Sequence, residues 1–214
     1  MIQIGFVGDC DCYDIVLYLS RILCRLGKAV LLVDVSPTRG LYCTLPQPGE
    51  LKKDMIAEYR GVYWSPELIG REMERSNYDV IIGHYGTSWY GIEDCDQIVY
   101  VTDQRKQAVR HLIQRPSSIS AAEEWLLIRD IIPCGIEPRY IKEMTQITTD
   151  RIYALSYDEV DVKKRIRNQY EERTNFRCIS KALQELLKDV IMQLCPDIDD
   201  KSYRKAYREA KGGK

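Results

Sequence analysis

The sequence predicts an α/β fold, with a mainly parallel sheet covered by helices on both faces and a helical C-terminal extension. Short apolar runs typical of buried strands alternate with segments whose apolar residues recur at helical spacing. The last third keeps only the helical spacing. The length of 214 residues suits one domain. We expect an α/β unit over residues 1–158, helices packed on it over 159–200, and a basic tail over 201–214.

The chain opens with a strand, a loop, a helix and a second strand. Residues 2–7 and 29–33 are the two apolar strands, and Gly27 ends the helix between them. One face of that helix carries Ile15, Leu19, Ile22, Leu23 and Leu26. A strand, a glycine-led loop, a helix and a strand together form a βαβ unit of the phosphate-binding type.

The middle of the chain continues the alternation. Residues 37–49 are rich in glycine and proline and predict a loop. We expect a short helix over 51–59, an extended segment over 61–64, and a helix that starts at Pro66 and runs to about residue 76. Further strands are expected at 79–84, 96–102, 125–128 and 152–158, with a helix over 104–114.

The C-terminal third predicts two helices and a tail. Residues 159–172 are charged and should lie on the surface, whereas 175–194 carry one apolar face. This face is expected to pack on the sheet, with docking of a partner as the alternative. Lys201 to Lys214 hold six basic residues and one acidic residue, and predict a solvated, frayed end. The alternative is weak membrane-surface contact through a thin apolar side made by Tyr203, Ala206, Tyr207 and Ala210.

Short motifs follow one another along the first 158 residues. They are Leu26-Gly27-Lys28, Leu32-Val33-Asp34-Val35-Ser36, Tyr78 to Ile82, Asp96 to Thr102, and Ile152 to Asp158. Their order and spacing resemble the ParA/MinD family of P-loop ATPases. The resemblance implies a P-loop NTPase-like fold and a phosphate-binding loop directly after the first strand.

That loop departs from the family pattern G-K-G-G-x-G-K-[ST]. Tyr13 replaces its last glycine, Asp14 replaces the Walker lysine, and Ile15 replaces the residue that holds magnesium. The vestigial loop consists of Gly8, Asp9, Cys10, Asp11, Cys12, Tyr13, Asp14 and Ile15. Asp34 and His84 should line the same crevice, because ligands bind at the carboxyl ends of parallel strands. His84 stands where the family has its Walker B aspartate.

These exchanges work against phosphate binding. Glycines let backbone N–H groups close around the anion, and a lysine reaches the β- and γ-phosphates. A carboxylate ~4 Å from a phosphate oxygen repels it by roughly 4 kcal/mol at an effective dielectric constant near 20. We therefore expect no catalytic residue and no cofactor. In the alternative, the chain binds ATP or ADP with magnesium and uses replacement cations, for which Arg39, Lys52, Lys53 and Arg129 are candidates.

Cys10 and Cys12 admit two further interpretations. They could offer two thiolates to a soft metal, but such sites usually need four ligands. A helix N-terminus could activate either thiol, although the neighbouring aspartates oppose a thiolate. We expect neither a metal site nor a reactive cysteine, and His84 and His111 are too distant in sequence to support a nucleophile–histidine pair.

The expected function is that of a ParA/MinD-like pseudo-ATPase that binds or positions a protein, with an active ATPase as the alternative. The resemblance extends to TadZ/CpaE-type proteins, which help to localise bacterial pilus or secretion machinery, and it implies a homodimer through the loop face. A formal net charge of −1 predicts no specific nucleic-acid binding. Eight scattered cysteines, no long apolar run and a first strand that starts at Ile2 favour the cytoplasm, or the periphery of the inner membrane.

Overall fold

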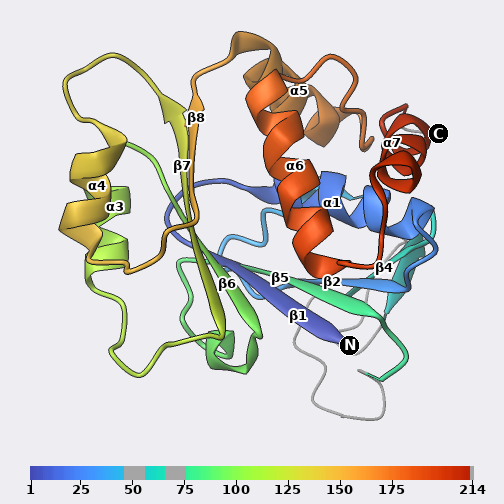
Figure 1. Cartoon of the computed structure of the whole chain (residues 1–214), viewed down its shortest axis with the longest axis horizontal. Helices are drawn as coiled ribbons and strands as arrows, with labels where there is room; N and C mark the ends of the chain where they lie inside the picture. Colours follow the sequence, from blue (N-terminus) through green and yellow to red (C-terminus); the bar gives the residue numbers. More distant parts are fainter. Residues whose placement is uncertain (46–55, 66–75, 213–214) are drawn as a thin grey trace.

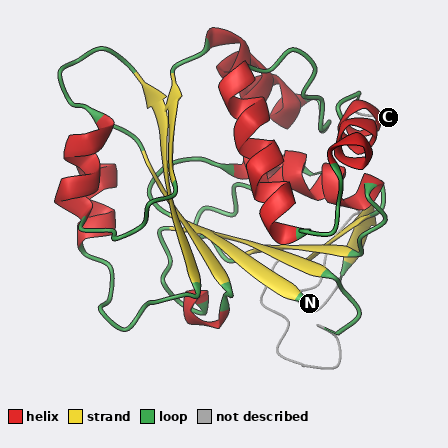
Figure 2. Cartoon of the chain, in the orientation of Figure 1, coloured by secondary structure: helices red, strands yellow, loops and turns green. Residues whose placement is uncertain are grey.

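The computed structural model describes residues 1–45, 56–65 and 76–212, and it places helices on both faces of one sheet (Figures 1 and 2). The sheet has eight strands in the order β3-β4-β2-β5-β1-β6-β7-β8. They are β1 (Ile2–Val7), β2 (Val30–Asp34), β3 (Ala57–Tyr59), β4 (Val62–Ser65), β5 (Val80–Gly86), β6 (Gln97–Thr102), β7 (Glu123–Ile131) and β8 (Ile152–Ser156). All pairings are parallel except that of β3 with β4, which confirms the predicted sheet.

Two groups of helices cover the sheet. They are α1 (Tyr13–Arg25), α3 (Lys106–Ile113), α4 (Pro138–Thr145), α5 (Glu159–Tyr170), α6 (Lys181–Leu194) and α7 (Asp200–Ala210), with short 3-10 turns at Tyr42–Thr44 and Ile92–Asp94. Figure 1 shows α3 and α4 on one face and α1, α5, α6 and α7 on the other. Both faces are covered, as the alternating pattern predicted. No helix in the described part of the chain is long and apolar enough to span a membrane.

The strand order brings three strand ends together. β5 pairs with β1 on one side and with β2 on the other, and Asp34 lies opposite His84 in the second pairing. All three strands run parallel, so the segments after them meet at one edge of the sheet. The loop that starts at Gly8 therefore lies beside Asp34 and His84.

The prediction of a helix over residues 51–59 is wrong for the part of this range that the structure describes. Residues 57–59 form the edge strand β3, which pairs antiparallel with β4. Arg60 and Gly61 both have positive φ, at 55° and 83°, and such a two-residue turn suits a tight hairpin. The extended segment expected over 61–64 is confirmed as β4. Residues 46–55 and 66–75 lie outside the described part, and with them most of the helix expected from Pro66 to about residue 76.

The long C-terminal helix begins later than its apolar pattern suggested. The Ser180 hydroxyl accepts a hydrogen bond from the Leu183 amide at 3.2 Å, so the helix begins at Lys181 instead of residue 175. Its apolar face packs into the core, as expected. In the preceding helix, α5, Asn168 is the single buried residue, which confirms the prediction of a charged helix at the surface.

The expected frayed tail is instead a packed helix. Asp199 caps α7, and the buried residues Tyr203, Ala206 and Ala210 belong to the main core, in which α7 contacts α1. The thin apolar side considered for membrane contact is therefore mostly occupied within the protein. Phe176 completes this packing, because its ring stacks on Tyr18 at 4.6 Å between centroids.

Replacing Phe176 with alanine should lower the free energy of unfolding by about 3–5 kcal/mol, because the ring is fully buried and also meets Tyr207 edge-on at 5.4 Å. Urea unfolding followed by circular dichroism measures the loss. Tyr170→Ala is the matched control, since Tyr170 is 87% exposed, and should change stability by less than about 0.5 kcal/mol. Equal stabilities of the two variants would contradict the packed arrangement of α7.

Candidate functional site

The loop over residues 8–15 starts with a glycine that the sheet itself requires. Gly8 has a φ of 151°, and a Cβ atom at this position would lie 1.7 Å from the backbone oxygen of Val101 in β6. Its amide also donates to the Gly86 carbonyl at 2.7 Å. The first glycine of the loop is therefore explained by close packing against neighbouring strands, whether or not a phosphate is bound.

The centre of the site is a buried ion pair between Asp14 and Arg129. Arg129 Nη1 lies 2.7 Å from Asp14 Oδ1, and Nη2 lies 2.9 Å from Oδ2, so the pair is bidentate. The two side chains are only 3% and 2% exposed. Arg129 Nη1 also donates to the Asp11 carbonyl at 2.6 Å. The first turn of α1 is thus tied to β7, and Arg129 is engaged by the protein's own carboxylate.

Both members of the pair stay charged. Burial would raise the pKa of Asp14, but the charge and hydrogen bonds of Arg129 outweigh burial and hold this pKa below its ordinary value. Burial would lower the pKa of Arg129, and Asp14 raises it instead. The carboxylate is therefore ionised at the place where the family resemblance puts the Walker lysine.

Asp34 and His84 form a second buried contact beside the loop. His84 Nδ1 lies 3.3 Å from Asp34 Oδ1, and the same oxygen accepts hydrogen bonds from the amide and the hydroxyl of Ser36 at 3.1 and 2.6 Å. The Tyr13 ring meets His84 edge-on at 6.4 Å. Burial would raise the pKa of Asp34, but the hydrogen bond to His84 and those from Ser36 and the Tyr42 amide hold it below its ordinary value. His84 is a packed, hydrogen-bonded residue.

Helix α5 covers the loop through Tyr13. The Tyr13 hydroxyl accepts a hydrogen bond from Gln169 Nε2 of α5 and donates to Asp11 Oδ2 at 3.3 Å. Burial and the charge of Asp11 raise the pKa of Tyr13 to about 12. The family pattern has a glycine here, which allows close approach of a phosphate. This chain has instead a neutral tyrosine ring that is hydrogen-bonded to α5.

A hollow of about 330 Å³ opens beside the loop and is mainly acidic. Its lining comprises Asp9, Cys10, Asp11, Asp103, Arg105, Asp130 and Arg165. Arg105 Nε lies 2.7 Å from Asp103 Oδ2, and Arg165 Nη2 lies 3.0 Å from Asp130 Oδ2, so both cations already have carboxylate partners. Four carboxylates against two guanidinium groups repel an anion and attract a cation.

The two cysteines of the loop are protonated thiols. Burial is the main cause that raises the pKa of Cys10, to about 12, and it also raises that of Cys12. Among the described residues, no three or more His, Cys, Asp or Glu side chains are placed so that they could hold a metal ion together. The reactive-thiol and metal interpretations therefore both lack support in this part of the chain.

The cations considered as replacements for the Walker lysine are placed differently. Arg129 is paired with Asp14, and Arg39 donates through Nη1 to the Asp34 carbonyl at 2.9 Å. Lys52 and Lys53 lie outside the described residues. Sequence reasoning missed Asp103 and Asp130, although both follow apolar strand runs at the same sheet edge as the loop, and this position was the available signal.

Several solved structures share the fold of this chain. A chain of the MinC:MinD cell division protein complex of Aquifex aeolicus superposes with a TM-score of 0.62 at 13% identity, over 98% of this chain and 95% of that one. A ParA family ATPase from Chlorobium tepidum TLS gives 0.53 at 13% identity, over 98% and 97%. An ATP complex of a McdA variant from Cyanothece gives 0.55 at 12% identity, over 100% and 97%.

The chain has the fold of the MinD and ParA ATPases. Identities of 12–13% show the fold alone and leave the activity open. No protein-family model matches the sequence, and no curated protein matches it either. The function must therefore be argued from the residues of the site within this MinD/ParA fold.

Asp14→Asn should lower the free energy of unfolding by about 3–5 kcal/mol, because it leaves the buried Arg129 charge without a counter-charge. Urea unfolding at neutral pH measures this loss. Asp11→Asn makes the same chemical change in the same loop, but at an exposed carboxylate, and should cost less than about 1 kcal/mol. Similar losses in both variants would contradict a structural role for the ion pair.

Proposed function

We propose that this chain is a ParA/MinD-like pseudo-ATPase, a protein that binds and positions a protein partner without turning over nucleotide. The observation that carries the proposal is the ion pair between Arg129 and Asp14. The family resemblance puts the phosphate-binding lysine at Asp14. Here that place holds a carboxylate, and the cation beside it is bound by this carboxylate on two hydrogen bonds.

Separating the ion pair would cost a substantial part of an ordinary nucleotide-binding free energy. Micromolar binding corresponds to about 8 kcal/mol. Diverting Arg129 to a phosphate would leave Asp14 buried without its partner, at a cost of about 3–5 kcal/mol. About half of the binding free energy would be offset, so the affinity should fall to about the millimolar range. Ile15 also opposes magnesium-dependent nucleotide binding, because its fully buried hydrocarbon side chain offers no oxygen to magnesium.

The alternative is an active ATPase with an atypical loop. Its support is the fold, which is shared with the ATP complex of McdA. This alternative needs a cation that can turn toward a phosphate. The candidates at the edge of the hollow, Arg105 and Arg165, are each bound to a carboxylate, at 2.7 and 3.0 Å. The charge pattern therefore favours the pseudo-ATPase.

The proposed partners are proteins. A structural neighbour is a chain of the MinC:MinD complex, and the resemblance to TadZ/CpaE-type proteins suggests localisation of bacterial pilus or secretion machinery, in the cytoplasm or at the periphery of the inner membrane. We include a homodimer through the loop face. The exposed Asp11 and Arg105 lie on that face and offer charges of opposite sign for a two-fold contact.

Calorimetric titration of the purified chain with Mg-ATP and Mg-ADP should detect no binding tighter than about 1 mM. Asp14→Asn frees Arg129 from its carboxylate, so phosphate should raise the melting temperature of this variant more than that of the unaltered chain. Asp11→Asn should respond to phosphate as the unaltered chain does. Micromolar, magnesium-dependent binding by the unaltered chain would overturn the pseudo-ATPase proposal.

Light scattering at tens of micromolar should show a dimer in the absence of nucleotide. Asp11→Arg should shift it to a monomer, because the substitution replaces the exposed carboxylate on the loop face with a cation. Asp150→Arg makes the same change at a fully exposed residue before β8, at the opposite edge of the sheet, and should leave the dimer intact. A monomeric unaltered chain would contradict the dimer.

A further inference from the structure

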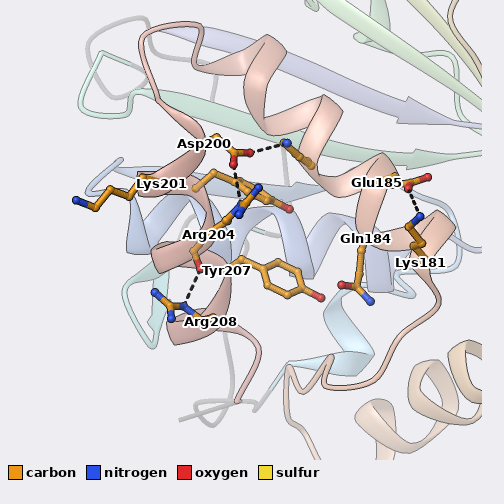
Figure 3. A pocket seen from close by; sticks show the side chains of 10 residues that line it. Lys181, Gln184, Glu185, Asp200, Lys201, Arg204, Tyr207 and Arg208 are labelled. Atoms are coloured by element: carbon orange, nitrogen blue, oxygen red, sulfur yellow. Dashed lines mark hydrogen bonds and ion pairs between the residues drawn. The ribbon is translucent and has the colours of Figure 1, made fainter.

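Helices α6 and α7 enclose a groove of about 700 Å³ that shares no lining residue with the loop (Figure 3). Its lining comprises Lys181, Gln184, Glu185, Lys188, Asp200, Lys201, Tyr203, Arg204, Tyr207 and Arg208. The groove owes its shape to the packing of α7, whose inner side is held in the core while its outer side remains exposed. A concave surface between two helices can receive a segment of another protein.

Two tyrosines give the groove a fixed aromatic floor. Tyr203 is 5% exposed, and its ring centroid lies 6.0 Å from that of the half-buried Tyr207. Phe176 holds the other side of Tyr207 edge-on at 5.4 Å. Figure 3 shows the Tyr207 ring across the groove, with its hydroxyl directed toward Gln184. An apolar or aromatic side chain can pack on such a floor with little rearrangement.

The rim of the groove is positively charged. Five basic side chains line it against two carboxylates. Asp200 already binds two of the cations, Lys188 Nζ at 2.6 Å and Arg204 Nε at 2.7 Å. In the described part of the chain, Lys201 has no carboxylate partner, and Arg208 Nε donates to the Arg204 carbonyl at 3.3 Å. Lys201 and Arg208 are therefore available to pair with carboxylates of a bound molecule.

We propose that this groove binds an acidic segment of a partner protein. One apolar or aromatic side chain of the segment lies on Tyr207, and its carboxylates pair with Lys201 and Arg208. Asp200 provides an example of such pairing within the chain itself, because its carboxylate binds a lysine and an arginine of the same rim. This site goes beyond the proposed function of the loop and rests on none of its residues.

The shape and charges of the groove favour a peptide over a phosphate polymer. Glu185 and Asp200 lie within the lining and would repel a continuous phosphate backbone. A peptide can instead alternate carboxylates with an apolar side chain, which matches a basic rim around an aromatic floor. Nucleic acid and anionic lipid are therefore the competitors to be tested.

The probe is a fluorescein-labelled helical peptide of about twelve residues, with a leucine stripe surrounded by glutamates, measured by fluorescence anisotropy on the full chain. Lys201→Glu and Arg208→Glu should each raise the Kd about fivefold or more, because each replaces a rim cation with an acid. Lys205→Glu is the matched control, an exposed lysine of the same helix outside the groove lining. It should change the Kd less than about twofold.

Three outcomes would overturn the proposal. The first is no peptide binding at roughly 100 µM chain. The second is an equal loss in Lys205→Glu, which would indicate general charge attraction. The third is tighter binding of duplex DNA, or of phosphatidylcholine vesicles containing phosphatidylglycerol, that is lost in Lys201→Glu and Arg208→Glu. Circular dichroism verifies that each variant folds. Nucleotide titrations of the loop do not bear on these outcomes, so the two proposals can fail separately.

Discussion

The ion pair between Asp14 and Arg129 joins the first turn of α1 to β7 at the carboxyl edge of the sheet. Two charges this deeply buried are tolerated only when each satisfies the other, because desolvation of either alone costs several kcal/mol. The pair fixes the start of α1 against β7, and the Arg129 bond to the Asp11 carbonyl fixes the loop between them. The loop is thus stabilised by an internal cation and an internal anion.

The position of α1 explains why the C-terminus must be structured. Residues 14–23 of this helix are buried without interruption, so a sheet on one side cannot cover it. A helix that is buried all round needs neighbours on every side, and α6 and α7 supply them. The consecutive apolar residues from Ile15 to Leu19 carried this information in the sequence. They indicate a doubly covered helix, and hence a packed segment where composition alone suggested a solvated tail.

Local patterns were sufficient for the mainly parallel sheet and for the helices that cover it. They were insufficient where the structure of a segment depends on contacts with residues distant in the sequence. Nothing in the spacing around Arg129 reveals Asp14, because the two residues meet only when β7 and α1 are assembled. The same holds for residues 57–59. They form a strand because they pair with β4 across a turn with two positive φ values. Burial around Cys10 and Cys12, which keeps both thiols protonated, is likewise a property of the assembled site.

A formal net charge of −1 conceals two surfaces of opposite sign. The hollow beside the loop has four carboxylates and two cations, whereas the groove between α6 and α7 has five cations and two carboxylates. Local fields act over about 10 Å at ordinary ionic strength, so a partner responds to the surface it meets and not to the total charge. Under the two proposals, the loop surface repels phosphate and the groove attracts carboxylate. The acidic hollow and the basic groove both suit contact with proteins. Under the two proposals, one chain with the MinD/ParA fold binds two partners through surfaces of opposite charge.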